Sequence, residues 1–159
     1  MAGMKVTVVS VGKLKEKFWK EAVAEYSKRL GGYCQLKLVE VADRDPGKCG
    51  GDAKAMEAEG ADILKAVPDS ARCVLLAIDG KQRSSEGFSK HLDELALGGA
   101  SELAFVIGGS TGVDPAVRKR ADETFSFGPI TLPHNLARVV LLEQLYRAFK
   151  ISRGEPYHK

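Results

Sequence analysis

The sequence is poor in cysteine and contains no long apolar run. Its three cysteines, Cys34, Cys49 and Cys73, are odd in number, far apart and free of any C-x-x-C spacing. This pattern argues against a disulfide framework and a zinc site, and it favours free thiols in a reducing compartment. No apolar stretch approaches the roughly 20 residues that span a bilayer, and the first residues do not follow the order of a secretory signal. We therefore expect a cytoplasmic protein with no membrane partner.

Several common catalytic and ligand-binding motifs are also missing. The sequence has no H-E-x-x-H, no close His/Asp/Glu cluster and no G-x-S-x-G, so we expect neither a metal site nor a hydrolase nucleophile. The segment IGGSTG (107–112) does not have the G-x-G-x-x-G spacing of a dinucleotide site. The segment SVGKLK (10–15) lacks the earlier glycine and the Ser or Thr of a P-loop.

The charge of the chain is small in total but unevenly distributed. The 159 residues suggest one domain over residues 1–159, with a net charge of +3. Residues 138–159 hold five basic and two acidic residues, which accounts for all of that charge. A second basic cluster lies near the start of the first expected helix: Lys13, Lys15, Lys17 and Lys20. Concentrated positive charge attracts phosphate backbones, although a basic chain end also complements a helix dipole.

Hydrophobic periodicity and turn signals predict alternating strands and helices. We expect strands over residues 5–11, 34–41, 72–78, 103–107 and 124–127. We expect helices over residues 16–30, 52–66, 84–97, 115–121 and 135–153, with a loop over 42–51 and a short tail, GEPYHK. This alternation predicts a three-layer α/β/α fold with a mostly parallel sheet.

Three loops rich in glycine or proline follow strands of this predicted sheet, at residues 79–81, 108–112 and 127–134. Ligands bind outside the carboxyl ends of strands in such sheets. The third loop is unusual, because Gly128, Pro129 and Pro133 stand among residues too apolar for an idle surface turn. We expect these three loops to form a ligand site.

The last helix carries two apolar stripes. One consists of Leu141, Leu142, Leu145, Ala148 and Phe149, and the opposite one of Leu136, Val139, Val140 and Tyr146. One stripe can cover the sheet, whereas the other needs a partner, so we expect a homodimer. The alternative is a central helix buried within a monomer. Glu143 and Arg147 are four residues apart and can pair.

Four segments together match one family: AIDGKQRSSEGF (77–88), FVIGGSTG (105–112), ITLPHNLARVVLLEQLYRAFKI (130–151) and GEPYHK (154–159). The combination of T-L-P-H, L-x-E-Q-L-Y-R-A and terminal P-Y-H is highly specific. On these residues the chain resembles the ribosomal RNA large subunit methyltransferase H (RlmH) family, the 23S rRNA (pseudouridine-N3)-methyltransferases of the SPOUT class. The resemblance runs from the first strand to the last residue.

The resemblance implies a fold, a cofactor and partners that the residue patterns alone do not give. It implies a C-terminal trefoil knot, a homodimer, S-adenosylmethionine as cofactor, and methylation of a pseudouridine in the helix 69 loop of 23S rRNA on the assembled ribosome. The implied cofactor-binding residues are Leu76, Gly108, Phe127, Gly128, Pro129, Ile130, Thr131 and Leu132. Many members carry a Ser-Lys-Met-like stretch where this chain has Phe127-Gly128-Pro129, and Pro129 removes one backbone donor.

The resemblance also implies three catalytic residues, Arg147, Tyr157 and His158. Arg147 can stabilise developing negative charge or hold a phosphate, Tyr157 can stack on or orient a base, and His158 titrates near neutral pH. His134 is expected to support the cofactor loop, and His91 to lie on the surface. Lys81 and Arg83 either contact phosphate or are solvated.

Two other functions remain open on the sequence. One is a ribosome-binding factor of the same fold without turnover. The other is a small-molecule methyltransferase or a flavodoxin-like nucleotide binder, since 159 residues leave no room for a separate RNA-binding domain.

Overall fold

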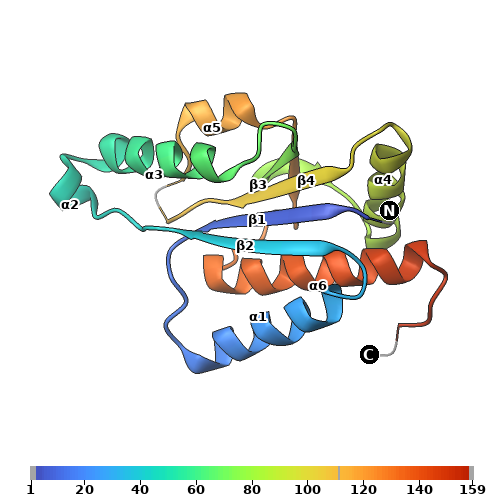
Figure 1. Ribbon diagram of the computed structural model, residues 1–159. Coiled ribbons are helices and arrows are strands. Elements are labelled where there is room, and N and C mark those ends of the chain that lie inside the picture. Colours follow the sequence, from blue (N-terminus) through green and yellow to red (C-terminus); the bar gives the residue numbers. More distant parts are fainter. Residues whose placement is uncertain (1–2, 111, 158–159) are drawn as a thin grey trace.

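A parallel five-stranded sheet forms the centre of the molecule (Figure 1). The computed structural model describes residues 3–110 and 112–157. In space the strands follow the order β2-β1-β4-β3-β5, and every neighbouring pair is parallel. The strands are β1 (Lys5–Val11), β2 (Gln35–Val41), β3 (Arg72–Gln82), β4 (Glu102–Ile107) and β5 (Glu123–Ser126).

Helices cover both faces of this sheet. Figure 1 shows α1 and α6 below the strands and α3 and α5 above them. The helix α4 packs against α6, as α1 does, so these three helices form one layer. The helices are α1 (Lys17–Leu30), α2 (Pro46–Cys49), α3 (Asp52–Ala66), α4 (Ser85–Leu97), α5 (Pro115–Arg120) and α6 (His134–Ser152).

The two layers of helices divide the sheet residues between two cores. Along β4, Phe105 belongs to the core beneath α1, α4 and α6, whereas Ala104 and Val106 belong to the core beneath α3 and α5. Successive residues of a strand point to opposite faces, which is why a continuous apolar run is needed in a strand covered on both sides. The predicted three-layer α/β fold with a parallel sheet is confirmed.

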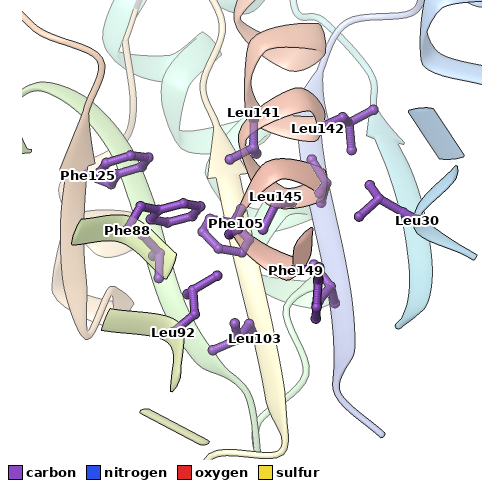
Figure 2. Packing of buried hydrophobic residues seen from close by; sticks show 14 of the residues in the cluster. Leu30, Phe88, Leu92, Leu103, Phe105, Phe125, Leu141, Leu142, Leu145 and Phe149 are labelled. Atoms are coloured by element: carbon purple, nitrogen blue, oxygen red, sulfur yellow. The ribbon is translucent and has the colours of Figure 1, made fainter. Parts of the chain in front are cut away.

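Aromatic side chains fill the larger core between the sheet and α4 and α6. Phe88 of α4 stacks on Phe125 of β5 with ring centroids 4.7 Å apart, and Phe105 of β4 meets Phe88 edge-on. Figure 2 shows these rings beside Leu141 and Leu145 of α6. The first predicted stripe of α6 is thus buried as expected.

The second stripe of α6 is only half-buried in the single chain. Leu136, Val139, Val140 and Tyr146 keep part of their surface accessible, although α1 packs along the same helix. The homodimer that this stripe predicts stays a prediction.

Helix starts follow the capping signals of the sequence. The Ser84 side chain accepts from the Gly87 N–H, and the Asp114 side chain accepts from the Ala116 N–H. The predicted loop over 42–51 is wrong in part, because Asp45 caps the short helix α2 by accepting from the Gly47 N–H. The cause is the same Asp-Pro signal that begins α5.

Truncating Leu145 is expected to destabilise the fold strongly. Leu145 is fully buried against the sheet, so Leu145→Ala removes buried surface and leaves a cavity that costs about 2–5 kcal/mol of unfolding free energy. Leu97→Ala is the matched control, because Leu97 is 89% exposed. Denaturant unfolding of both variants measures the difference, and equal losses would contradict the assigned position of α6.

Candidate active site

A cavity of about 680 Å³ lies at the carboxyl ends of β3, β4 and β5. It is lined by residues 76–78, 107–110, 112–113, 125–128 and 130–134, together with Arg118 and Ala137. Two of the three predicted loops, those at 108–112 and 127–134, therefore contribute most of their described residues to the cavity. From the loop at 79–81, the structure places none of the residues in the lining, and the preceding residues 76–78 take that position.

The predicted cofactor residues gather at this cavity with one exception. Leu76, Gly108, Phe127, Gly128, Ile130, Thr131 and Leu132 all line it. Pro129 lies in the same loop but is not one of the lining residues. Ile130 is 71% exposed, so the loop presents an apolar side chain at the cavity rather than burying it in the core.

The strand β3 leaves the sheet and rejoins it beside this cavity. Both Leu76 and Lys81 pair with Phe125 of β5, so residues 77–80 stand outside the ladder. Gly80 is the last residue of this excursion. A side chain does not fit there, because a Cβ on Gly80 would lie 2.9 Å from the backbone N and C of Phe125. The strand was predicted to end at residue 78, and the excursion explains why it continues to Gln82.

The buried side chain of Ser126 ties two walls of the cavity together. Its hydroxyl donates to the Ile78 carbonyl at 3.0 Å and accepts from the Gly128 N–H at 3.0 Å. Ile78 belongs to the β3 excursion and Gly128 to the loop after β5. Sequence reasoning missed Ser126, because a lone serine at a strand end carries no signal until its partners are known.

The loop after β4 is shaped by glycine. The Gly112 N–H donates to the Gly109 carbonyl at 3.1 Å, and Gly112 has a φ of +95°. A Cβ on Gly108 would lie 2.5 Å from Cγ1 of Val113. Gly108 is one of the cofactor-binding residues that the resemblance implies, and the structure shows that the turn itself has no room for a side chain there.

An ion pair between a buried arginine and an exposed glutamate anchors the first turns of α6 next to the cavity. Arg138 is only 3% exposed and donates to Glu40 Oε2 at 2.7 Å and to the Gly12 carbonyl at 3.0 Å. A Cβ on Gly12 would lie 3.4 Å from Nε2 of His134, which itself lines the cavity. This position fits the expected role of His134 as support for the cofactor loop.

Arg147 and Tyr157 form a second cluster with Glu143. The Arg147 Nε lies 3.3 Å from Glu143 Oε2, and its guanidinium carbon lies 3.9 Å from the centre of the Tyr157 ring. The Tyr157 hydroxyl donates to Glu143 Oε1. Burial, and then the hydrogen bond to Glu143, raise the pKa of Tyr157 to about 12, so the phenol keeps its proton at neutral pH. The Glu143 carboxylate likewise raises the pKa of Arg147.

One chain does not bring this cluster and the cavity together. Ala137 lines the cavity, and Arg147 follows ten residues later on α6. At roughly 1.5 Å per residue, Arg147 lies about 15 Å farther along the helix axis. His158, the third predicted catalytic residue, lies outside the described residues.

Among the other charged residues, His91 differs from expectation. His91, expected on the surface, is half-buried and its Nε2 lies 2.7 Å from Glu123 Oε1. Lys81 and Arg83 do not line the cavity, whereas Arg118 does. The Nη2 atom of Arg118 lies 3.6 Å from Asp79 Oδ1. The sequence gave only a weak signal for Arg118, its place in a basic run at the end of α5.

Two further findings concern membrane spans and metal ligands in the described part of the chain. Over residues 3–110 and 112–157, no helix is long and apolar enough to cross a membrane. The same residues bring no three His, Cys, Asp or Glu side chains together as metal ligands.

A parallel α/β sheet with a ligand-sized cavity outside its strand ends is typical of proteins that bind a small molecule at that edge. The sequence model of the family described as "Predicted SPOUT methyltransferase" matches residues 4–158. The chain belongs to this SPOUT methyltransferase family, which confirms the resemblance of its motifs.

Relatives with curated names are similar over nearly the whole chain. The chain is 53% identical to "Ribosomal RNA large subunit methyltransferase H" of Listeria monocytogenes serotype 4a (strain HCC23), over 98% of this chain and 100% of the relative. Proteins of the same name from Bifidobacterium adolescentis and Bacillus cytotoxicus are 50% and 49% identical with the same coverage.

Removing the Ser126 hydroxyl is expected to loosen the cavity wall. Ser126→Ala leaves the half-buried Gly128 N–H and the Ile78 carbonyl without this partner, which lowers the free energy of unfolding by about 1 kcal/mol. Hydrogen exchange should accelerate at Gly128, with little change at the middle of β1. Ser101→Ala, at an exposed position, is the control. Unchanged exchange at Gly128 would contradict the role of this hydroxyl.

Proposed function

We propose that this protein is an S-adenosylmethionine-dependent methyltransferase of large-subunit ribosomal RNA. Membership in the SPOUT family gives the class of reaction, and the names of relatives about half identical along the whole chain support the RNA substrate. The observation that carries the proposal is the cavity formed by the loops after β4 and β5. In finer detail, we propose transfer to N3 of a pseudouridine in the helix 69 loop of 23S rRNA, on the assembled ribosome.

The cavity suits a cofactor of this kind in size and chemistry. Its volume of about 680 Å³ lies within the range of small-molecule sites. Leu76, Ile130 and Leu132 offer apolar walls to an adenosine or a methionine chain, while the backbone groups of Gly108 and Gly128 can form hydrogen bonds at its edges. Pro129 cannot donate, so its position contributes shape alone.

The bound cofactor supplies an electrophilic methyl group on a sulfonium. The protein must therefore hold the nucleophilic nitrogen in line with that methyl group, exclude water and let the N3 proton leave. Arg147 stays cationic and is suited to stabilise the anion that develops on the base. Tyr157, with its proton retained, is suited to donate a hydrogen bond or to stack on the base rather than to accept the proton. His158 is proposed as a further catalytic residue.

We propose that the working enzyme is a homodimer with composite active sites. Arg147 lies about 15 Å along the axis of α6 from Ala137, which lines the cavity. Within one chain, Arg147 is therefore too far away to act on a ligand there. A second copy can bring its Arg147 and Tyr157 to the cavity, and the half-buried stripe of α6 provides apolar surface for that contact. The family's trefoil knot and the cytoplasmic location stay predictions.

The proposed function is tested by methyl incorporation from labelled S-adenosylmethionine. Three substrates are compared: assembled ribosomes without the modification, free large subunits, and protein-free ribosomal RNA. We expect label in assembled ribosomes only, because a small protein with a net charge of +3 has weak affinity for naked RNA and depends on the ribosome to present the loop.

Mapping the labelled nucleotide then separates the coarse proposal from the fine one. Label at N3 of a pseudouridine in the helix 69 loop supports both. Label elsewhere in the large-subunit RNA contradicts only the proposed target nucleotide. Ribosome binding without label or cofactor affinity would instead indicate a non-catalytic binding factor.

A further inference from the structure

A basic segment at the start of α1 has no part in the site described above. Lys13, Lys15, Lys17 and Lys20 are all exposed. Within residues 3–110 and 112–157, Lys17 is the only one of the four with a carboxylate within 4.0 Å, that of Glu21 at 3.7 Å. Both members of this pair are mostly exposed, so water screens it and leaves the lysine charge available.

The positive charge of these lysines is unfavourable at the place where they lie, around the N-terminus of α1. The N-terminus of a helix carries partial positive charge, so lysine there is unfavourable. The first turn of α1 contains Lys17 and no acidic residue, and the Glu16 side chain makes no capping hydrogen bond. Positive charge at this position weakens the helix slightly, which points to a gain from binding an anion.

An exposed aromatic ring interrupts the same segment. Phe18 is 62% exposed, and its ring rests against that of Trp19 with centroids 5.1 Å apart. An exposed aromatic ring among lysines is an arrangement that proteins use to stack on the bases of single-stranded nucleic acids.

A groove of about 410 Å³ runs beside the segment, between α1, β2 and the start of α6. Lys13 and Lys20 contribute to its lining, and Leu14, Val23 and Leu38 give it apolar walls. Cations at the edge of an apolar groove suit a nucleotide, which combines a flat base with a charged phosphate.

The segment begins at the edge of the cofactor cavity. Lys13 directly follows Gly12, and a Cβ on Gly12 would lie 3.4 Å from His134, which lines that cavity. When an RNA strand places one nucleotide at the cavity, the nucleotides next to it can therefore reach residues 13–20.

We propose that residues 13–20 bind the RNA substrate on one side of the reacting nucleotide. The lysines contact phosphates, the Phe18 ring stacks on an unpaired base, and the groove holds a flanking nucleotide. This inference rests on the proposed function, because it assumes an RNA substrate at the cavity.

The test replaces all four lysines at once, as Lys13→Gln, Lys15→Gln, Lys17→Gln and Lys20→Gln. We expect kcat/KM for assembled ribosomes to fall about 10- to 100-fold and the salt dependence of ribosome binding to weaken by about one unit of slope per lost phosphate contact. S-adenosylmethionine affinity and the mass of the protein in solution should not change. The melting temperature should stay the same or rise, since the substitutions relieve charge at the helix N-terminus.

A matched control removes the same charge from the opposite helical layer: Lys48, Lys54, Lys65 and Lys119, all exposed. It should keep nearly full activity. Equal losses in the two quadruple variants would overturn the proposal, because net charge alone would then explain the effect. A changed mass in solution or a lost cofactor affinity in the first variant would overturn it as well.

Sedimentation with ribosomes is measured beside methylation so that the two proposals fail separately. A wild-type protein that binds ribosomes without methylating them contradicts the proposed function, and the lysine variant still tests the surface by its binding. If wild-type protein methylates ribosomes and the lysine variant does so equally well, only the surface is wrong. Phe18→Ala should raise KM with little change in kcat, whereas Leu97→Ala, at another exposed apolar position, should change neither.

Discussion

The burial of one face of α6 against the sheet determines where both functional clusters lie. Leu141, Leu142 and Leu145 have no exposed surface, so the helix can neither rotate nor slide without breaking the larger core. Its first turns are fixed further by Arg138, whose guanidinium joins Glu40 of β2 and the Gly12 carbonyl. Removing Glu40 would leave the charge of the buried Arg138 guanidinium without its carboxylate partner, which makes this anchor hard to lose.

A rigid α6 has a chemical consequence. The same helix presents His134 and Ala137 to the cavity and Arg147 to the cluster with Glu143 and Tyr157 about three turns later. No bending of a packed helix brings these positions together. In the proposed reaction, a methyl group held in the cavity and the cation of Arg147 meet at one nucleotide when they come from different copies of the chain. In the single chain Arg147 already contacts Glu143 and Tyr157. In its proposed role, Arg147 would exchange those contacts for contacts with the substrate.

Much of the fold followed from local patterns in the sequence, and the details that depend on long-range partners did not. The strand at Lys5–Val11 and the helix at Asp52–Ala66 were predicted with the bounds that the structure has. The β3 excursion could not be predicted, because only the pairing of both Leu76 and Lys81 with Phe125 defines it. Residues 127–132 were placed at the ligand site by family resemblance and by their unusual apolar content. Ser126 and Arg118 carried no comparable signal, since their roles depend on neighbours distant in sequence.

The most direct test of this account is complementation between two inactive variants. Gly108→Val fills a turn with no room for a side chain and should abolish cofactor binding. Arg147→Ala should keep cofactor binding and lose methyl transfer. Mixed dimers are purified with two different tags, one variant in each subunit, and assayed on assembled ribosomes. Composite sites predict about half of wild-type activity, because one of the two sites combines an intact cavity with an intact Arg147. Activity no higher than that of either variant alone would contradict the account and place the whole site within one chain.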